Sequence, residues 1–480
     1  MLRLYNTLTR KKEKFIPISD RKVGFYSCGI TAYFYPHIGN MRRYVMDDIV
    51  KRTMLHDKYY VTHVENITDV GHLVGDANTT DDKMRVEAEK EHKTMKAVAM
   101  FYFGIFENDM KLLNIIKPSK MPFASEHVPE MISLIKKLDD KGFLYRLDSG
   151  IYFDTSRFKD YGRLTGSDFD TLNAQLKGGA RVERVAGIRN ITDFAVWRFA
   201  EGTDMIWDSP WGRGFPGWHI ECSVLSMMEL GEHFDVHTGG VDHIAVHHSN
   251  EIAQSESATG KKFVNYWVHH EFLTVNGQKM SKSLGNQIDP LAVASELSPD
   301  ALRYYLLRAN GFGLDGDVSM ESLYRVYNAD LANDLGNLLS RVVALSMQKG
   351  GGVAPAVPEI GGDVLGAGPL VEAAVSAWNA FKPNDAIEHA MAIVRAGNAL
   401  LERVEPWRRP ALDPESLDAL GRVREGLRLA AAILSPAIPR ASAEILSRLG
   451  FGARGELRWT PEPGGAALEK GAPLFPRVVK

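Results

Sequence analysis

The sequence predicts an α/β fold with a doubly wound parallel sheet, followed by an all-α helical bundle. Two apolar runs, Val23–Tyr26 and Tyr59–Thr68, read as buried strands, and apolar residues recur at helical spacing across 41–56 between them. This β-α-β order is typical of one half of a nucleotide-binding sheet. From Ser298 onward the apolar pattern is almost entirely helical, which predicts the bundle.

The 480 residues suffice for about three domains. We place the sheet domain in 1–270, with a small insertion at about 149–203 where short strand-like pieces alternate with turns. A connecting region, 271–320, carries a lysine-containing loop. The helical domain, 321–480, contains a linker rich in glycine and proline at 349–369.

The composition is that of an ordinary soluble globular protein and does not identify a binding partner. A hydrophobic content of 45% and a charged content of 24% are ordinary for a soluble globular protein, and the net charge of −3 neither supports nor excludes nucleic-acid binding. Two cysteines form no disulfide framework and favour a reducing, cytoplasmic compartment. No signal peptide or membrane span is visible, and we expect a monomer.

The first chemically suggestive stretch is Cys28 followed by Pro36–Asn40, at the crossing from the first strand into the first helix. In an α/β sheet this crossing lies at the carboxyl end of a strand, where ligands bind and a helix N-terminus offers N–H groups to an anion. A thiol and an imidazole are therefore placed where chemistry is possible. A lone cysteine is, by itself, more often a buried apolar side chain.

Four residues form a candidate metal site: Cys28, Cys222, His247 and Glu251. His247 and Glu251 are four positions apart and would share one face of a helix. Two thiolates with an imidazole and a carboxylate suit Zn²⁺ better than Mg²⁺ or Ca²⁺. We expect the neighbouring His248 to point away from that face. The alternative is two unrelated core thiols and a solvated pair of histidines.

Two segments resemble the signatures of class I aminoacyl-tRNA synthetases: Pro36-His-Ile-Gly-Asn40 and Lys279-Met-Ser-Lys-Ser283. Further stretches resemble the cysteinyl branch of that class: those around Cys28, Asn66–Asp69, Gly217–Ser223 and His247–Ser255. The resemblance extends from residue 1 to about 290. It implies a split Rossmann catalytic domain that joins L-cysteine to tRNA at the expense of ATP, through a cysteinyl adenylate.

The resemblance also implies roles for individual residues. One Zn²⁺ per chain would be held by Cys28, Cys222, His247 and Glu251. The amino-acid pocket would contain Thr31, Thr68, Trp218 and His237. ATP, with its Mg²⁺, would contact His37, Gly39, Asn40, Gly239, Gly240, Asp242 and Lys282. The groups assisting catalysis would be His37, Asn40, Lys279 and Lys282.

These roles agree with the chemistry of adenylation. A carboxylate attacks the α-phosphate of ATP in line, so the protein mainly positions reactants and stabilises charge. An imidazole at a helix N-terminus and two loop lysines supply that stabilisation. A zinc ion that binds the substrate thiolate would select cysteine over serine without an editing domain.

The sequence departs from the cysteinyl pattern in three places. Asn40 stands where the general class I signature has histidine, and the residues after Asp69 lack the usual short run of aspartates. The tail resembles methionyl-tRNA synthetases, in which Asn337, Arg341 and Trp407 would match positions that read the anticodon. The plainer interpretation of these three residues is packed helices around a core tryptophan.

Three other functions stay open on the sequence. A methionyl enzyme is favoured by the tail and opposed by the thiol-rich metal set. A ligase joining cysteine to an amino sugar shares the catalytic motifs and is opposed by the helical tail. A non-catalytic RNA-binding paralogue is opposed by the intact lysine loop. We expect a cysteine-specific tRNA as the partner, because the metal chemistry is harder to change than a few base-reading side chains.

Overall fold

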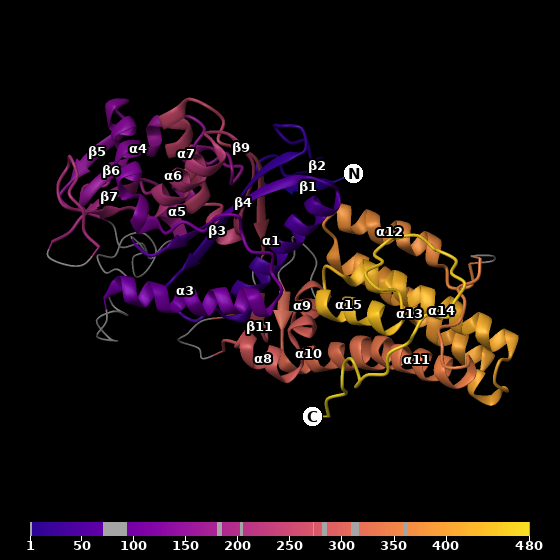
Figure 1. Ribbon diagram of the computed structural model, residues 1–480. Coiled ribbons are helices and arrows are strands. Elements are labelled where there is room, and N and C mark those ends of the chain that lie inside the picture. Colours follow the sequence, from indigo (N-terminus) through magenta and orange to yellow (C-terminus); the bar gives the residue numbers. More distant parts are fainter. Residues whose placement is uncertain are drawn as a thin grey trace.

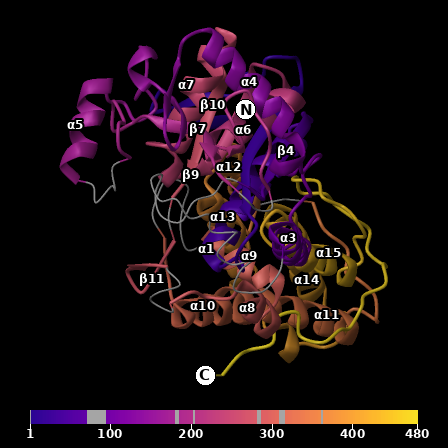
Figure 2. The same ribbon diagram turned by 90° about the vertical axis from the view of Figure 1, so that its left-hand side faces the viewer.

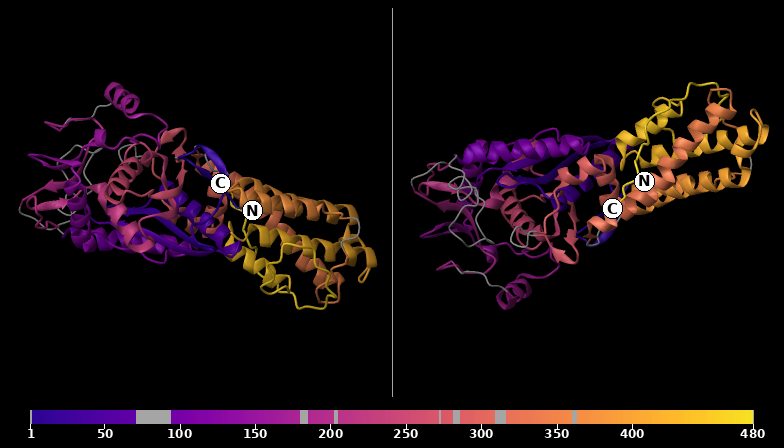
Figure 3. Two further views of the ribbon diagram at one scale, coloured as in Figure 1. Left: turned by 90° about the horizontal axis from the view of Figure 1, so that it is seen from above. Right: turned by 90° about the horizontal axis from the view of Figure 1, so that it is seen from below.

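The computed structural model has an α/β part at one end and a helical bundle at the other (Figures 1 and 3). It describes residues 2–70, 94–179, 185–201, 205–271, 273–280, 286–308, 316–359 and 363–479. The two parts share one continuous apolar core. The predicted order of an α/β fold followed by an all-α bundle is confirmed.

The central sheet has four parallel strands in the order β10-β9-β3-β4. Their bounds are β3 (Lys22–Thr31), β4 (Tyr60–Thr68), β9 (Phe234–Gly240) and β10 (Val264–His270). The chain leaves β3 in one direction to β4, and the later strands add on the other side. The sheet is therefore doubly wound, and the switch in strand order falls between β3 and β9, where such sheets bind ligands.

Helices cover both faces of this sheet (Figure 2): α1 (Ile38–His56), α3 (Met95–Leu112), α6 (Trp218–Leu230) and α7 (His247–Thr259). Side chains of a strand alternate between faces. Val23 and Phe25 accordingly enter the core containing α1 and α3, whereas Tyr26 and Cys28 enter the core formed with α6 and α7. This alternation turns the Cys28 thiol toward α6 and α7.

An antiparallel sheet, ordered β5-β6-β7-β8, interrupts the chain between the two halves of the central sheet. Its elements are β5 (Leu144–Leu147), β6 (Gly150–Phe153), β7 (Phe194–Phe199) and β8 (Gly214–Pro216), preceded by α4 (Val128–Asp140) and accompanied by α5 (Phe169–Gly179). The inserted sheet thus extends beyond 149–203 on both sides. Strands β5 and β8 are too short to show an apolar period.

The second half of the chain is mainly helical. A small sheet of β11 (Leu273–Val275), β12 (Gln278–Lys279) and β13 (Gly316–Val318) accompanies α8 (Pro290–Glu296) and α9 (Pro299–Arg308). The bundle contains α10 (Met320–Val326), the π-helical segment η4 (Tyr327–Gly336), α11 (Asn337–Lys349), α12 (Ala367–Asn379), α13 (Pro383–Val404), α14 (Pro414–Leu434) and α15 (Pro439–Arg448). The N-terminal hairpin of β1 (Arg3–Asn6) and β2 (Lys11–Lys14) lies near α12 (Figure 1).

The described part of the predicted linker is packed rather than free. Val353 and Val357 form antiparallel bridges with Ala467 and Glu462 of the C-terminal segment. Val357 is also buried. Glycine and proline prevented a helix here, but they did not prevent extended pairing, which the composition alone could not predict.

A buried arginine joins the two ends of the molecule. Arg303 of α9 donates to Asp48 Oδ2 of α1 at 2.7 Å, to Leu113 O at 2.9 Å and to Pro436 O at 2.5 Å. Its side chain and that of Asp48 are both fully buried. One guanidinium therefore connects α1, the end of α3 and the turn after α14.

Two further observations concern the helices. Within the described residues, none of the helices combines the length and the apolar character that crossing a membrane requires. The sequence also predicts a helix over 84–94, and this segment lies almost wholly outside the described residues.

Candidate active site and metal centre

The candidate site lies at the carboxyl edge of the central sheet. Strand β3 ends beside β9, and its register shifts between Ser27 and Ile30 in a β-bulge against β4. Bulges re-aim side chains and are common next to active sites. Cys28 lies within this bulge, at the switch point of the strand order.

The first signature, Pro36–Asn40, forms a turn that caps the first helix, and we call it the signature turn. His37 is the N-cap of α1; its Nδ1 accepts the N–H of Gly39 at 3.1 Å, and Asn40 Oδ1 accepts the N–H of His37 at 3.0 Å. Burial lowers the pKa of His37, so the imidazole is neutral at neutral pH and can act as a hydrogen-bonding group. Asn40 therefore helps to cap α1 by holding the backbone of His37.

The four predicted metal ligands converge in the structure. Atoms of Cys28, Cys222, His247 and Glu251 that can ligate a metal all lie within 4.8 Å of one another, and all four residues are buried. Glu251 Oε1 is 3.1 Å from His247 Nε2 yet has no hydrogen-bond donor among the described residues. A buried carboxylate oxygen without a donor is costly, and a cation would satisfy it. The donor set therefore fits a metal ion.

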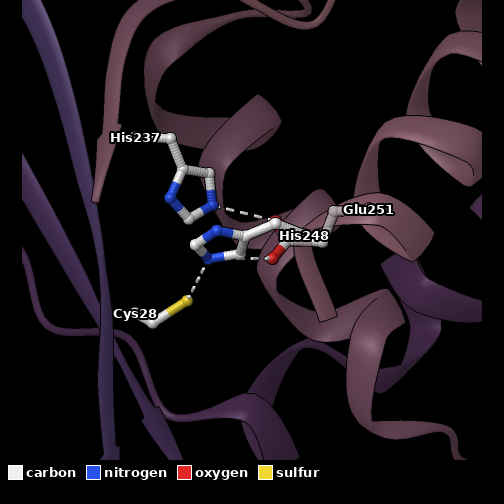
Figure 4. A group of neighbouring side chains, drawn as sticks. All are labelled: Cys28, His237, His248 and Glu251. Carbon is white, nitrogen blue, oxygen red and sulfur yellow. Dashed lines mark hydrogen bonds and ion pairs between the residues drawn. The ribbon is translucent and has the colours of Figure 1, made fainter. Parts of the chain in front are cut away.

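The expectation for His248 is wrong. Its Nε2 lies 3.2 Å from Cys28 Sγ and 3.9 Å from Glu251 Oε1, so it points into the site (Figure 4). Positions three apart on a helix share a face as positions four apart do, which the sequence interpretation neglected. A second possible ligand group results: Cys28, His237, His248 and Glu251.

A layer of polar groups orients these imidazoles. The Nδ1 atoms of His219 and His247 are 2.9 Å apart, and His248 Nδ1 is 2.7 Å from His269 Nε2. His269 Nδ1 in turn lies 2.8 Å from Thr7 Oγ1. Partners of this kind fix the tautomer of a ligating histidine. The predicted site did not include His219, although it lies within the stretch Gly217–Ser223, and it did not include His269 of β10.

The site is charged despite its burial. Burial raises the pKa of Glu251, but His237 and His247 outweigh it and lower that pKa to about 2. Glu251 Oε2 is 2.9 Å from His237 Nε2. Burial likewise lowers the pKa of His247, whereas Cys28 and Glu251 raise it to about 10. Glu251 is therefore a carboxylate at neutral pH, as a metal ligand must be.

The two thiols differ. Burial raises the pKa of both, but at Cys28 the hydrogen bond from Cys222 and the neighbouring imidazoles prevail and hold the pKa well below its usual range. The pKa of Cys222 lies well above its usual range. Two neighbouring thiolates repel each other, so one of the two sulfurs keeps its proton when no cation lies between them.

Of the residues predicted for the amino-acid pocket, Trp218 and His237 contact the proposed metal ligands, whereas Thr31 and Thr68 lie at the carboxyl ends of neighbouring strands. Thr31 and Thr68 are paired on β3 and β4, and the ring of Trp218 lies 4.4 Å from that of His247. Thr68 donates to Glu221, a buried carboxyl whose pKa burial raises well above its ordinary value. A protonated Glu221 can donate a hydrogen bond in turn, a feature that the sequence did not reveal.

Of the residues predicted for ATP, Gly239 and Gly240 end β9 and Asp242 lies on the turn that follows, whereas His37, Gly39 and Asn40 lie at the start of α1. A Cβ at Gly239 would meet His248 Cε1 at 2.5 Å, so a larger residue there would displace the histidine. Asp242, two residues after Gly240, is exposed on the 3-10 turn Val241–His243.

The second signature, Lys279–Ser283, is the lysine loop. The described residues at its start and after it contact the signature turn. A Cβ at Gly39 would lie 2.7 Å from Met280 Cε, and Ile38 donates its N–H to Ile288 O at 3.0 Å. The backbone of Lys279 belongs to β12, whereas Lys282 lies outside the described residues. The described flanks thus bring the two signatures together.

Comparison with known proteins supports the class that the motifs suggest. Residues 14–314 match the family described as "tRNA synthetases class I (C) catalytic domain". The chain belongs to the class I tRNA synthetases. Among curated relatives, proteins named "Cysteine--tRNA ligase" are 52% identical over 291 residues in Treponema denticola and 46% identical over 313 residues in Zymomonas mobilis. The predicted resemblance is confirmed at this level.

These alignments are partial. They cover 60% and 64% of this chain and only 58% and 60% of those two relatives. A solved structure, "Mycobacterium tuberculosis methionyl-tRNA synthetase in complex with methionyl-adenylate", matches with a TM-score of 0.76 across 95% of this synthetase and 100% of that chain. Its identity is 21%, so it establishes the fold alone.

The tail of this class I synthetase brings its three predicted anticodon residues to one surface. Asn337 is exposed at the start of α11, and Arg341 follows one turn later. Arg341 Cζ lies 5.2 Å from the centre of the Trp407 ring, and Trp407 is 37% exposed. A core tryptophan would be buried, so this observation opposes the plainer interpretation.

Proposed function

We propose that this class I synthetase attaches L-cysteine to tRNA through a cysteinyl adenylate formed from ATP. The observation that carries the proposal is the buried convergence of Cys28, Cys222, His247 and Glu251 beside the signature turn. The names of the curated relatives support the same substrate.

Zn²⁺ is the metal we propose for this site. Two sulfurs, an imidazole and a carboxylate are the donors that Zn²⁺ takes in a tetrahedral arrangement. Bound there, Zn²⁺ would supply a ligation position that suits a thiolate and matches a hydroxyl poorly. Trp218 and His237 would close the pocket around the short side chain, and Thr31 and Thr68 would bind its polar groups.

We propose that the protein's own residues position ATP for the attack. His37 and the N–H groups at the start of α1 would hold phosphate oxygens, because a helix N-terminus favours an anion. Gly239, Gly240 and Asp242 would bind the adenosine, and Lys279 and Lys282 would stabilise charge on the triphosphate that arrives with Mg²⁺. Asn40 would act mainly by fixing the backbone of His37.

The surface formed by Asn337, Arg341 and Trp407 is our candidate for reading the anticodon. An exposed indole beside a guanidinium can stack on a splayed base and donate hydrogen bonds to its edge. Arg341 also forms a 2.7 Å ion pair with Glu402 at the surface. We expect the tRNA for cysteine, because a mismatch between amino acid and tRNA would corrupt protein synthesis.

Amino-acid-dependent pyrophosphate exchange tests the proposal. Purified protein with ATP should exchange pyrophosphate with cysteine and far less with serine or methionine. Strong exchange with methionine would favour a methionyl enzyme, and exchange without any transfer to tRNA would favour a ligase of a different acceptor. Absence of exchange with all three would favour a non-catalytic paralogue.

A further inference from the structure

Three large exposed side chains lie just before the signature turn or on α3, the helix that Tyr35 contacts, and none has a role in the proposal above. Tyr35, two residues before His37, is 52% exposed, and Met100 and Phe101 on α3 are 50% and 44% exposed. We call Tyr35, Met100 and Phe101 the aromatic lip. Contiguous apolar exposure beside a binding site marks an interaction surface.

The aromatic lip is fixed in place before any partner arrives. The Tyr35 ring packs edge-to-face against Tyr102 at 5.2 Å and against Phe101 at 6.5 Å. Tyr102 is itself buried and packs on Phe101 at 5.2 Å. Rings held in this way lose little conformational freedom when a ligand stacks on them.

The surrounding charge favours a polyanion. Lys96 and Lys111 are exposed on the same helix, α3, as Met100 and Phe101. The intervening Glu107 is engaged by Lys117 Nζ at 2.5 Å. The exposed strip of α3 therefore presents two lysines and large apolar side chains, the combination with which proteins bind single-stranded nucleic acid.

The position of the lip decides which nucleic-acid segment it would bind. Tyr35 lies on the loop that links Cys28 to His37, so a strand stacked on it ends close to the proposed adenylate site. Only an unpaired strand exposes base faces for stacking. We propose that the aromatic lip stacks on the single-stranded 3′ end of the tRNA and holds it at the entrance of the site. This inference rests on the proposed function.

The test compares two forms of one RNA. Wild-type protein should bind transcribed cysteine tRNA more tightly than the same tRNA lacking its last three nucleotides. The Tyr35→Ala/Phe101→Ala variant should lose on the order of tenfold in affinity for the full-length RNA, from the loss of base stacking. Its affinity for the shortened RNA should stay the same, and pyrophosphate exchange should remain within about twofold of wild type, because the lip does not contact ATP in this account.

Tyr60→Ala is the matched control, since Tyr60 is 74% exposed at the amino end of β4, on the opposite edge of the sheet. It should leave both affinities unchanged. Equal weakening toward both RNAs, no weakening, or a raised KM for ATP or cysteine would overturn the inference. Failure of cysteine exchange in the wild type would instead overturn the proposed function, and unfolding midpoints of the variants would separate misfolding from either result.

Discussion

Arg303 provides the sharpest prediction about how the two ends of the molecule are held together. Arg303→Met keeps much of the side-chain length but removes the guanidinium. The change leaves Leu113 O without this donor in a buried environment and Pro436 O without it in a partly buried one, and it deprives Asp48 of one of its cationic partners. Asp48 keeps Arg52, whose Nε lies 2.7 Å from the same carboxylate oxygen.

The expected loss of stability follows from these contacts. Removing one partner of a buried ion pair costs about 3–5 kcal/mol, and each buried carbonyl left without a donor costs about 1–3 kcal/mol. These costs overlap, and the apolar methionine offsets part of them, so we predict about 3–5 kcal/mol for the change. Arg52→Met should cost only about 1–2 kcal/mol, because Arg52 is partly exposed and Arg303 remains on Asp48.

Urea unfolding of the wild type and both variants measures these costs, followed by fluorescence and by circular dichroism so that a separate transition of either part is visible. Pyrophosphate exchange and transfer to tRNA should be measured below the transition. Transfer should fall more than exchange, because α1 carries both Asp48 and the His37 turn and Arg303 ties it to the bundle. Equal destabilisation by the two variants would refute the reasoning.

The remaining predictions concern the proposed reaction. Purified protein should contain about one zinc per chain, and Cys222→Ser should lower the zinc content and weaken cysteine binding while ATP binding persists; full occupancy in a variant lacking both cysteines would show that the ligands are misassigned. Lys282→Ala should slow adenylate formation by on the order of a hundredfold, chiefly in kcat, and an unchanged kcat with a lower Tm would indicate a structural lysine. Trp407→Ala should weaken transfer to tRNA with little effect on pyrophosphate exchange, and equal loss in both assays would remove the tryptophan from RNA recognition.

The first half of the sheet could be predicted from the sequence, because its two strands and the helix between them carry clear apolar patterns. The strand predicted over Tyr59–Thr68 is β4, and the helix predicted across 41–56 is α1. Strand β8, only three residues long, has too few residues for a period. It forms a strand because it pairs with β7, and this pairing depends on tertiary contacts rather than on the local sequence.

The candidate site was partly predictable for a similar reason. Motif spacing identified His247 and Glu251, whose separation is local, and the same helical geometry places His248, three positions before Glu251, on their side of α7. The residues that hydrogen-bond to the proposed ligands are even harder to predict from the sequence. His219 and His269 come from elements far apart in the chain, and only the fold brings them to the ligands.

Charging of two purified tRNAs shows whether the protein joins cysteine to the tRNA for cysteine. The protein should be incubated with ATP and labelled cysteine or methionine, together with either cysteine tRNA or methionine tRNA. The account predicts that cysteine is loaded onto cysteine tRNA and that the other three combinations stay at background. Methionine loaded onto either tRNA, or cysteine loaded onto methionine tRNA, would contradict it.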